Sequence, residues 1–321
     1  MRDAIEKERQ SERCSVASMR AAAAEGMYSH VDKQLFADSQ GLRRLVRSDT
    51  SPLNFKWLES EGNLVGSGSY GCVYHCSEVN TGHAFAVKVF EDEEAFRAEL
   101  QCLTMVQQGT HQLYFPKLYG SHGSDCLNAV FLEMFDCDVR ALLLSEGAVI
   151  PAVGDAIIRQ VREALAFLHG DARLVHTDIK ASNVLWLGVA RRAVLADFSS
   201  AEKCASPLDH VVTTLNYRAP EVFVGGPDQQ ISPAIDIWSF GCFSWEVASV
   251  SGGHSPQLLF PGRVEKQIQY GHKCFFESRS QASALLRMTG AWLAAVSGCL
   301  HREPCDRLLW TPAPSSASGC S

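Results

Sequence analysis

The chain has 321 residues, of which 46% are hydrophobic and 20% are charged, and its formal net charge is −7. This composition is ordinary for a globular protein, and the negative charge argues against a broad nucleic-acid surface. No apolar run approaches the roughly 20 residues of a membrane-spanning helix, so we expect neither nucleic acid nor membrane among the partners. The 12 cysteines are scattered without C-x-x-C pairs, which favours reduced thiols over a disulfide framework or a zinc site.

Residues 1–52 are polar, charged and rich in Ala and Ser, and we interpret them as a partly disordered N-terminal extension. The extension starts with mixed acidic and basic residues, unlike the apolar core of a signal peptide or an acid-poor transit peptide. We therefore expect a cytoplasmic and/or nuclear protein. Residues 311–321 are predicted to form a disordered tail.

From residue 53 the pattern becomes strand-like, and strands are predicted at NLVG, CVYHC and HAFAVKVF. Because side chains alternate along a strand, Ala86 and Lys88 share one face of the third of these strands. A further strand is predicted to end with AVFLEMF, residues 129–135.

Helical patterns dominate the rest of the chain. Residues 91–107 are predicted to form a helix with an apolar face that also carries Glu99. Residues 157–168 have an apolar stripe at helical spacing, and residues 236–247 are apolar nearly all round, as a buried helix is. The order indicates an α+β protein with a β-rich N-terminal lobe and a mainly helical C-terminal lobe.

A glycine-rich string, GSGSYGCV from Gly66 to Val73, fits the pattern G-x-G-x-x-G-x-V. Glycines let a backbone approach phosphates and adopt positive φ. Dinucleotide-binding folds carry a similar string before a helix, whereas this one runs from strand to strand. The context favours a nucleotide loop between two strands, and the alternative is a plain glycine-containing hairpin turn.

Lys88 lies inside an apolar strand, where an ammonium group needs a partner because its burial is costly. Glu99, on the apolar side of a predicted helix, needs one for the same reason. We therefore predict an ion pair between them. The alternative is an edge-strand lysine whose ammonium reaches water.

The run VHTDIKASNVL places Asp178, Lys180 and Asn183 at fixed spacing, and Asp197 follows in ADFS. Metal-assisted phosphoryl transfer needs one carboxylate to orient the attacking hydroxyl, and an amide and a second carboxylate to hold Mg²⁺. The alternative for any single one of these residues is a loop cap.

Over about residues 55–309 these motifs together resemble the eukaryotic protein kinases of the Ser/Thr type. The resemblance implies the bilobal kinase fold, with lobes at residues 53–135 and 136–310. It also implies transfer of the ATP γ-phosphate to Ser or Thr of protein substrates, with ATP and Mg²⁺ as cofactors.

The resemblance assigns roles to single residues. Asp178 would be the catalytic base or hydroxyl-orienting group, with Lys180 and Thr214 beside it, and Asn183 and Asp197 would be the Mg²⁺ ligands. The residues implied at the nucleotide site are Val65, Gly66, Gly68, Gly71, Val73, Ala86, Lys88, Glu99, Glu133, Phe135 and Leu185.

The second half of the chain carries further motifs of the family. Ala219-Pro220-Glu221 matches the A-P-E motif, whose glutamate would pair with Arg307, and Asp236 matches the aspartate that anchors the catalytic loop. The runs VVTTLNYRAPEV and LFPG resemble the CMGC group of cyclin-dependent, MAP and LAMMER-type kinases. By that resemblance, Arg218 would favour Pro after the target Ser or Thr, which we state as a hypothesis.

Three departures from the family pattern have consequences. Thr177 replaces the arginine of HRD, as in LAMMER and SR-protein kinases, so we expect activity without obligatory loop phosphorylation. Ser199 replaces the glycine of DFG, a mild change if its φ is negative. The chain ends soon after Arg307, so we expect a curtailed last helix and marginal stability.

An active protein kinase is therefore the leading hypothesis. The alternative is a pseudokinase or scaffold that binds ATP with little or no phosphotransfer. A small-molecule or lipid kinase is disfavoured by Thr214, the A-P-E motif and Arg218, which build a protein-docking loop. We expect a monomer, and the sequence identifies no regulatory partner.

Overall fold

The structure is a computed structural model, and it describes residues 55–56, 64–68, 71–78, 84–108, 110–124, 127–145, 151–208, 213–225, 229–251, 255–277 and 296–307. The predicted N-terminal extension and C-terminal tail lie outside these residues.

The described residues form two compact units. The first contains those up to Glu93 together with Ser121–Phe131, and the second contains Glu94–Gly120 and those from Leu132 onward. The boundary that we predict between the two lobes, after residue 135, stays a prediction.

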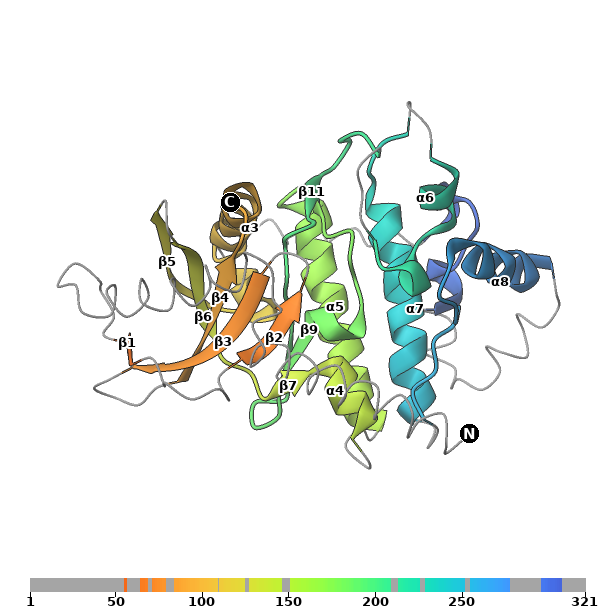
Figure 1. Cartoon of the computed structure of the whole chain (residues 1–321). Coiled ribbons are helices and arrows are strands. Elements are labelled where there is room, and N and C mark those ends of the chain that lie inside the picture. Colours follow the sequence, from red (N-terminus) through yellow and green to blue (C-terminus); the bar gives the residue numbers. More distant parts are fainter. Residues whose placement is uncertain are drawn as a thin grey trace, which may run out of the picture. The chain divides into compact units, whose positions relative to one another are not determined.

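A six-stranded sheet has the order β1-β3-β4-β6-β5, with β2 paired to β3 (Figure 1). Its strands are β1 (Phe55–Lys56), β2 (Leu64–Gly68), β3 (Gly71–Glu78), β4 (Ala84–Phe90), β5 (Leu118–Ser124) and β6 (Leu127–Glu133). The first three predicted strands are confirmed as β2, β3 and β4. Phe85, Val87 and Val89 of β4 are buried on one face, because alternate side chains of a strand point the same way.

One predicted strand end is wrong: β6 ends at Glu133 and not at Phe135. The Glu133 amide donates to the carbonyl of Lys117 (2.9 Å), whereas the Asp136 amide donates to the carbonyl of Trp186 (3.1 Å). The backbone therefore changes its pairing partner between these residues, and the strand stops there.

The helices whose bounds lie in the described residues are accompanied by short 3₁₀ turns at residues 110–114, 181–183, 215–217 and 304–306. The helices are α3 (Glu93–Val106), α4 (Val139–Leu144), α5 (Pro151–Gly170), α6 (Pro220–Val224), α7 (Pro233–Ser251) and α8 (Glu265–Glu277).

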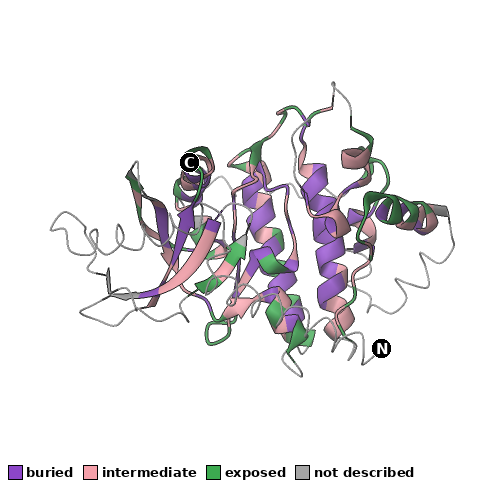
Figure 2. Ribbon diagram, viewed as in Figure 1, coloured by how far each residue is buried: buried purple, intermediate pink, exposed green. Residues whose placement is uncertain are grey.

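The helical predictions are confirmed in kind and in their buried faces. Glu99 is buried on α3 beside Phe96 and Leu103, as the pattern predicts. Helices α5 and α7 pack against each other and carry much of the buried surface of the second unit (Figure 2). None of the described helices is both long and apolar enough to cross a membrane.

Short strands in the second unit frame the loop that contains Asp178. They are β8 (Leu174–Val175), paired to β11 (Glu202–Lys203), and a three-stranded sheet of β7 (Cys137–Asp138), β9 (Val184–Leu187) and β10 (Arg192–Leu195). Residues 176–183 connect β8 to β9, so both ends of this loop are fixed by backbone pairing. Each cysteine in the described residues is a free thiol.

Candidate active site

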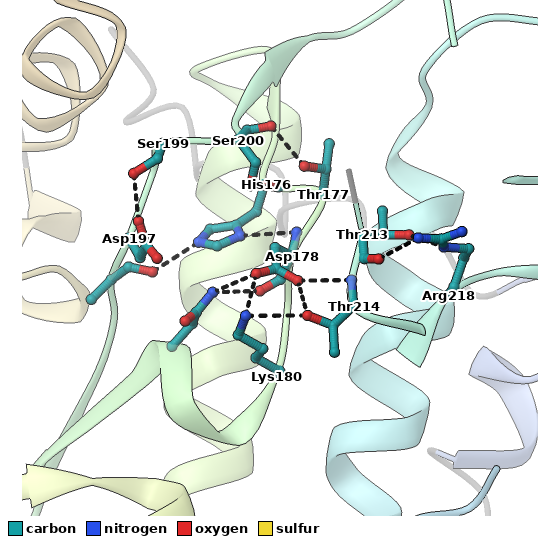
Figure 3. Close-up of polar contacts among 12 residues, drawn as sticks. His176, Thr177, Asp178, Lys180, Asp197, Ser199, Ser200, Thr213, Thr214 and Arg218 are labelled. Atoms are coloured by element: carbon teal, nitrogen blue, oxygen red, sulfur yellow. Dashed lines mark hydrogen bonds and ion pairs between the residues drawn. The ribbon is translucent and has the colours of Figure 1, made fainter. Parts of the chain in front are cut away.

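Asp178 is the centre of a network of four hydrogen-bond donors (Figure 3). Its Oδ1 accepts from the backbone amide (3.1 Å) and the hydroxyl (2.6 Å) of Thr214. Its Oδ2 accepts from Nζ of Lys180 (2.6 Å) and Nδ2 of Asn183 (3.1 Å). Lys180 also donates to the hydroxyl of Thr214 (3.1 Å), so these two side chains hold each other as well as the carboxylate.

The charge state of Asp178 follows from this network. Burial by itself raises the pKa of the carboxyl, but the hydrogen bonds from Lys180 and Thr214 and the charge of Lys180 outweigh it. The net pKa of Asp178 is lowered, because these donors stabilise the charged form. The group is therefore a fixed, ionised carboxylate at neutral pH.

A buried carboxylate on α7 fixes the backbone just before Asp178. Oδ2 of Asp236 accepts from the amide of His176 (2.7 Å) and Oδ1 accepts from the amide of Thr177 (2.8 Å). Thr177 has a positive φ of 65°, which is costly for a β-branched residue, and these bonds hold it there. The predicted anchoring role of Asp236 agrees with this geometry.

His176 joins the Asp178 loop to the segment that carries Asp197. Its Nε2 lies 3.0 Å from the carbonyl of Ala196 and its Nδ1 accepts from the amide of Asp178 (3.3 Å). The amide of Ala196 in turn donates to the carbonyl of Asn183 (2.9 Å). The side chains of Asn183 and Asp197 are therefore carried by backbone segments that are bonded to each other.

Comparison with known proteins gives the family. Residues 60–313 match the model of the protein kinase domain. The chain belongs to the protein kinase family.

Three relatives place this kinase within the family. It is 32% identical over 220 residues to cyclin-dependent kinase B2-1 of Arabidopsis thaliana and 30% identical over 220 residues to cell division control protein 2 homolog D of Antirrhinum majus. Each match covers 63% of this chain and 67% of the relative. Cell division control protein 2 homolog 3 of Trypanosoma brucei brucei is 30% identical over 197 residues, which is 58% of this chain and 61% of the relative. The chain is a Ser/Thr protein kinase of the CMGC group, and its substrates are ATP and proteins.

The oxygen donors near Asp178 suit the divalent metal that kinases use. The Nδ2 of Asn183 donates to the carbonyl (2.9 Å) and carboxylate of Asp178, which leaves its Oδ1 as the group able to bind a cation. Asp197 supplies a carboxylate. Among the described residues no group of three or more His, Cys, Asp or Glu could hold a metal alone. Mg²⁺ is commonly bound by one or two protein oxygens together with substrate phosphates, so this donor set fits it.

The first unit carries the glycine-rich loop and Lys88. Gly71 has φ 143°, and a Cβ there would lie 1.9 Å from the carbonyl oxygen of Val89, so only glycine fits against β4. At Gly66 an added Cβ would meet no atom of the described residues within 4 Å, so packing does not require glycine there. Lys88 is 8% exposed and lies opposite Val73 in the β3–β4 register. Lys88 and Glu99 belong to different units, so their ion pair stays a prediction.

The remaining predicted nucleotide residues divide between the units. Val65 is 55% exposed on β2 and Ala86 is half-buried on β4, both in the first unit. In the second unit, the carboxylate of Glu133 pairs with Arg192, whose guanidinium lies 5.3 Å from the ring centre of Phe135. Leu185, on β9, pairs with Asp138 of β7.

The docking loop is held by Arg218 (Figure 3). Its guanidinium donates to the backbone carbonyl (2.7 Å) and the hydroxyl (2.8 Å) of Thr213, and to Glu265 at the start of α8 (2.7 Å). Thr213 is buried, so Arg218 fixes the carbonyl direction in the residue before Thr214.

Glu221 and Arg307 form a two-pronged ion pair. The guanidinium of Arg307 donates to the two carboxylate oxygens of Glu221 at 2.6 and 2.7 Å, and it also donates to the carbonyl of Ala234 (2.8 Å). The Arg307 side chain is fully buried. The predicted pairing of the A-P-E glutamate with Arg307 is therefore present.

Sequence reasoning missed two contacts near the site. Ser199, which we treated only as a replaced glycine, has its Oγ 2.7 Å from a carboxylate oxygen of Asp197 and 2.7 Å from one of Glu99. The hydroxyl of Thr177 donates to the backbone carbonyl of Ser200 (2.6 Å). The change from glycine to serine was a visible signal for the first contact, whereas a carbonyl acceptor leaves no signal in the sequence.

Proposed function

We propose that Asp178 orients the hydroxyl of a Ser or Thr substrate toward the γ-phosphate of ATP, and that its four-donor network carries this function. A carboxylate whose pKa is lowered is a weak base. It therefore holds the hydroxyl in line and takes its proton late, as suits a loose transition state with little early bond formation.

The network also suggests how Lys180 and Asn183 act. A carboxylate offers about four acceptor positions, and donors from Thr214, Lys180 and Asn183 fill them. An incoming substrate hydroxyl must replace one donor. We assign this exchange to Lys180, whose ammonium then neutralises the charge on the transferred phosphoryl group.

Mg²⁺ is the divalent metal that we propose for the site, held by Asn183 and Asp197 together with phosphate oxygens. When bound, it would neutralise charge on the β- and γ-phosphates. For the nucleotide we propose Lys88, paired with Glu99, at the α/β-phosphates, and backbone groups of Glu133 and Phe135 at the adenine.

Activity without loop phosphorylation is supported by how residues 200–208 are anchored. Thr177 holds the carbonyl of Ser200, and β11 pairs with β8. The amide of Ala205 donates to the carbonyl of Ile231 and the amide of Ile231 donates to the carbonyl of Ser206, both at 2.8 Å. These bonds supply the order that a phosphate–arginine contact gives in kinases with HRD.

A preference for Pro after the target residue remains a finer proposal. It rests on Arg218, whose guanidinium donates to the Thr213 carbonyl. Because this carbonyl is already bonded, a substrate amide gains no hydrogen bond from it. A proline, which has no backbone N–H, therefore loses no hydrogen bond at this position. A peptide array with wild type and Arg218→Ala tests it. A Pro preference that is present in wild type and weaker in the variant supports the proposal, and equal rates for Pro and non-Pro peptides in wild type refute it.

Transfer of labelled γ-phosphate to a pool of Ser-Pro and Arg-Ser peptides tests the proposed function. We expect phosphoserine or phosphothreonine in Mg²⁺ and none after chelation of divalent metal. ATP binding with no transfer would favour the pseudokinase alternative, which no observation among the described residues supports.

A further inference from the structure

Ser199 joins two carboxylates that lie far apart in the sequence. Its Oγ is 2.7 Å from Oε2 of Glu99, on α3, and 2.7 Å from Oδ1 of Asp197. Glu99 is 1% exposed and Ser199 is half-buried, so water competes little for these contacts. Figure 3 shows the Ser199 hydroxyl directed at Asp197.

The backbone at Ser199 does not require glycine. Among the described residues Asp197 has a positive φ of 64°, but Ser199 is not one of the residues with positive φ. A serine therefore adds a hydroxyl here without backbone strain. The replaced glycine had no side chain with which to contact Glu99.

The chemistry of a hydroxyl makes this contact a link that can shift. It carries one proton, so it donates to one carboxylate at a time while the other lies within reach. A hydrogen bond to an ionised group contributes roughly twice as much as a neutral one. If the Asp197 carboxylate is taken up by a cation, the proton of Ser199 remains available to Glu99.

We propose that Ser199 is a positioning residue whose hydroxyl, by donating to Glu99, ties α3 to the segment that carries Asp197, so that the helix and the metal-binding segment keep one arrangement. The roles of Glu99 and Asp197 in this inference rest on the proposed function. The contacts of Ser199 with Glu99 and Asp197 are observed directly, whatever the function of the site.

Hydrogen exchange in the nucleotide-free, metal-free protein tests the link directly. In Ser199→Ala we expect the amides of α3 to exchange roughly tenfold faster, the factor expected for one lost hydrogen bond to a charged group. Ser199→Thr keeps the hydroxyl and should restore slow exchange. Ser200→Ala is the matched control, because it removes a neighbouring hydroxyl whose contact within the described part of the chain is a long one, 3.5 Å from the carbonyl of His176.

A second readout separates positioning from general stability. In Ser199→Ala, the Mg²⁺ concentration that half-saturates the tightening of ADP binding should rise severalfold, while ADP affinity without Mg²⁺ should not change. A merely structural serine would instead lower the melting temperature and leave this Mg²⁺ dependence as in wild type.

Ser199→Gly provides the sharpest contrast, because it restores the glycine of the family. If Ser199 positions Glu99 and Asp197, this variant should exchange as fast at α3 as Ser199→Ala. Equal α3 exchange in wild type, Ser199→Ala and Ser199→Gly would overturn the inference. Failure of the proposed function would appear separately, as no phosphotransfer by wild type whatever the exchange result.

Discussion

At the scale of single residues, the site is defined by donors that converge on Asp178. Thr214 contributes both its amide and its hydroxyl, and it accepts from Lys180. The hydroxyl is thus the one group that contacts both charged members of the network.

Replacement of Thr214 by Val keeps the shape and the amide bond but removes the hydroxyl. We expect kcat to fall about tenfold to a hundredfold, because a hydrogen bond to a charged group contributes about 1.5–3 kcal/mol, while KM for ATP changes little. Steady-state kinetics with a peptide substrate measure this. Thr214→Ser should remain within a few-fold of wild type, and an unchanged kcat in a folded Thr214→Val protein would show that the hydroxyl is dispensable.

How far the sequence predicts the site depends on how local a contact is. Asp178, Lys180 and Asn183 lie in one short loop, so their spacing alone indicates that they meet. The partner of Ser199 lies 100 residues away on α3, and no spacing rule connects them. The carbonyl that Thr177 binds could not be predicted either, because every residue has one.

At the scale of elements, the helices follow their hydrophobic patterns and the strand ends do not. The apolar run of α7 is buried as its all-round pattern predicts. The predicted end of β6 is wrong because the backbone there changes its hydrogen-bond partner from Lys117 to Trp186. This change depends on residues that are distant in the sequence.

Helix α8 contains a buried histidine that gives the fold a pH dependence. His272 packs against the rings of Phe260 and Trp238, with ring centres 4.4 and 5.0 Å away. Burial, together with the nearby positive charge of Arg307, lowers the pKa of His272 to about 4. The folded protein therefore favours the neutral ring, and the unfolded chain takes up the proton near pH 6.5.

The sign of the effect follows from this difference in pKa. The stabilisation by His272 is fully present above pH 6.5 and is lost as the pH falls toward 4, by about 2 kcal/mol at pH 5. Between pH 7.5 and pH 5, we expect the free energy of unfolding of wild type to fall by about 2 kcal/mol more than that of His272→Phe. Urea unfolding at the two pH values measures this difference. The exposed His301 provides the control His301→Gln, which should follow wild type. Equal pH dependence in wild type and His272→Phe would contradict the assignment.

At the scale of the whole molecule, contacts between distant segments hold the docking loop to the body of the second unit. Arg307 bonds to Glu221, although α7 and α8 lie between the two residues in the sequence. Its guanidinium also lies 5.1 Å from the ring centre of Trp238. The resemblance to kinases predicted this pair, whereas composition and periodicity could not.

Breaking this pair should destabilise the protein strongly. In Arg307→Leu we expect a loss of about 3–5 kcal/mol in the free energy of unfolding, because Glu221 is left without its cation. Arg302→Ala removes an exposed arginine nearby and should change stability little. Urea unfolding compares the two variants, and similar small losses in both would mean that the buried pair contributes nothing special.

The central claim is that this kinase transfers phosphate through Asp178 without prior phosphorylation of its loop. The most direct test is the initial rate of γ-phosphate transfer to a peptide by protein treated with a phosphatase, which is then removed, beside an identically treated Asp178→Asn variant. We predict sustained transfer by wild type and a rate lower by about 10²–10⁴-fold in the variant. No transfer by folded, ATP-binding wild type after this treatment, or equal rates in the two proteins, would contradict the account.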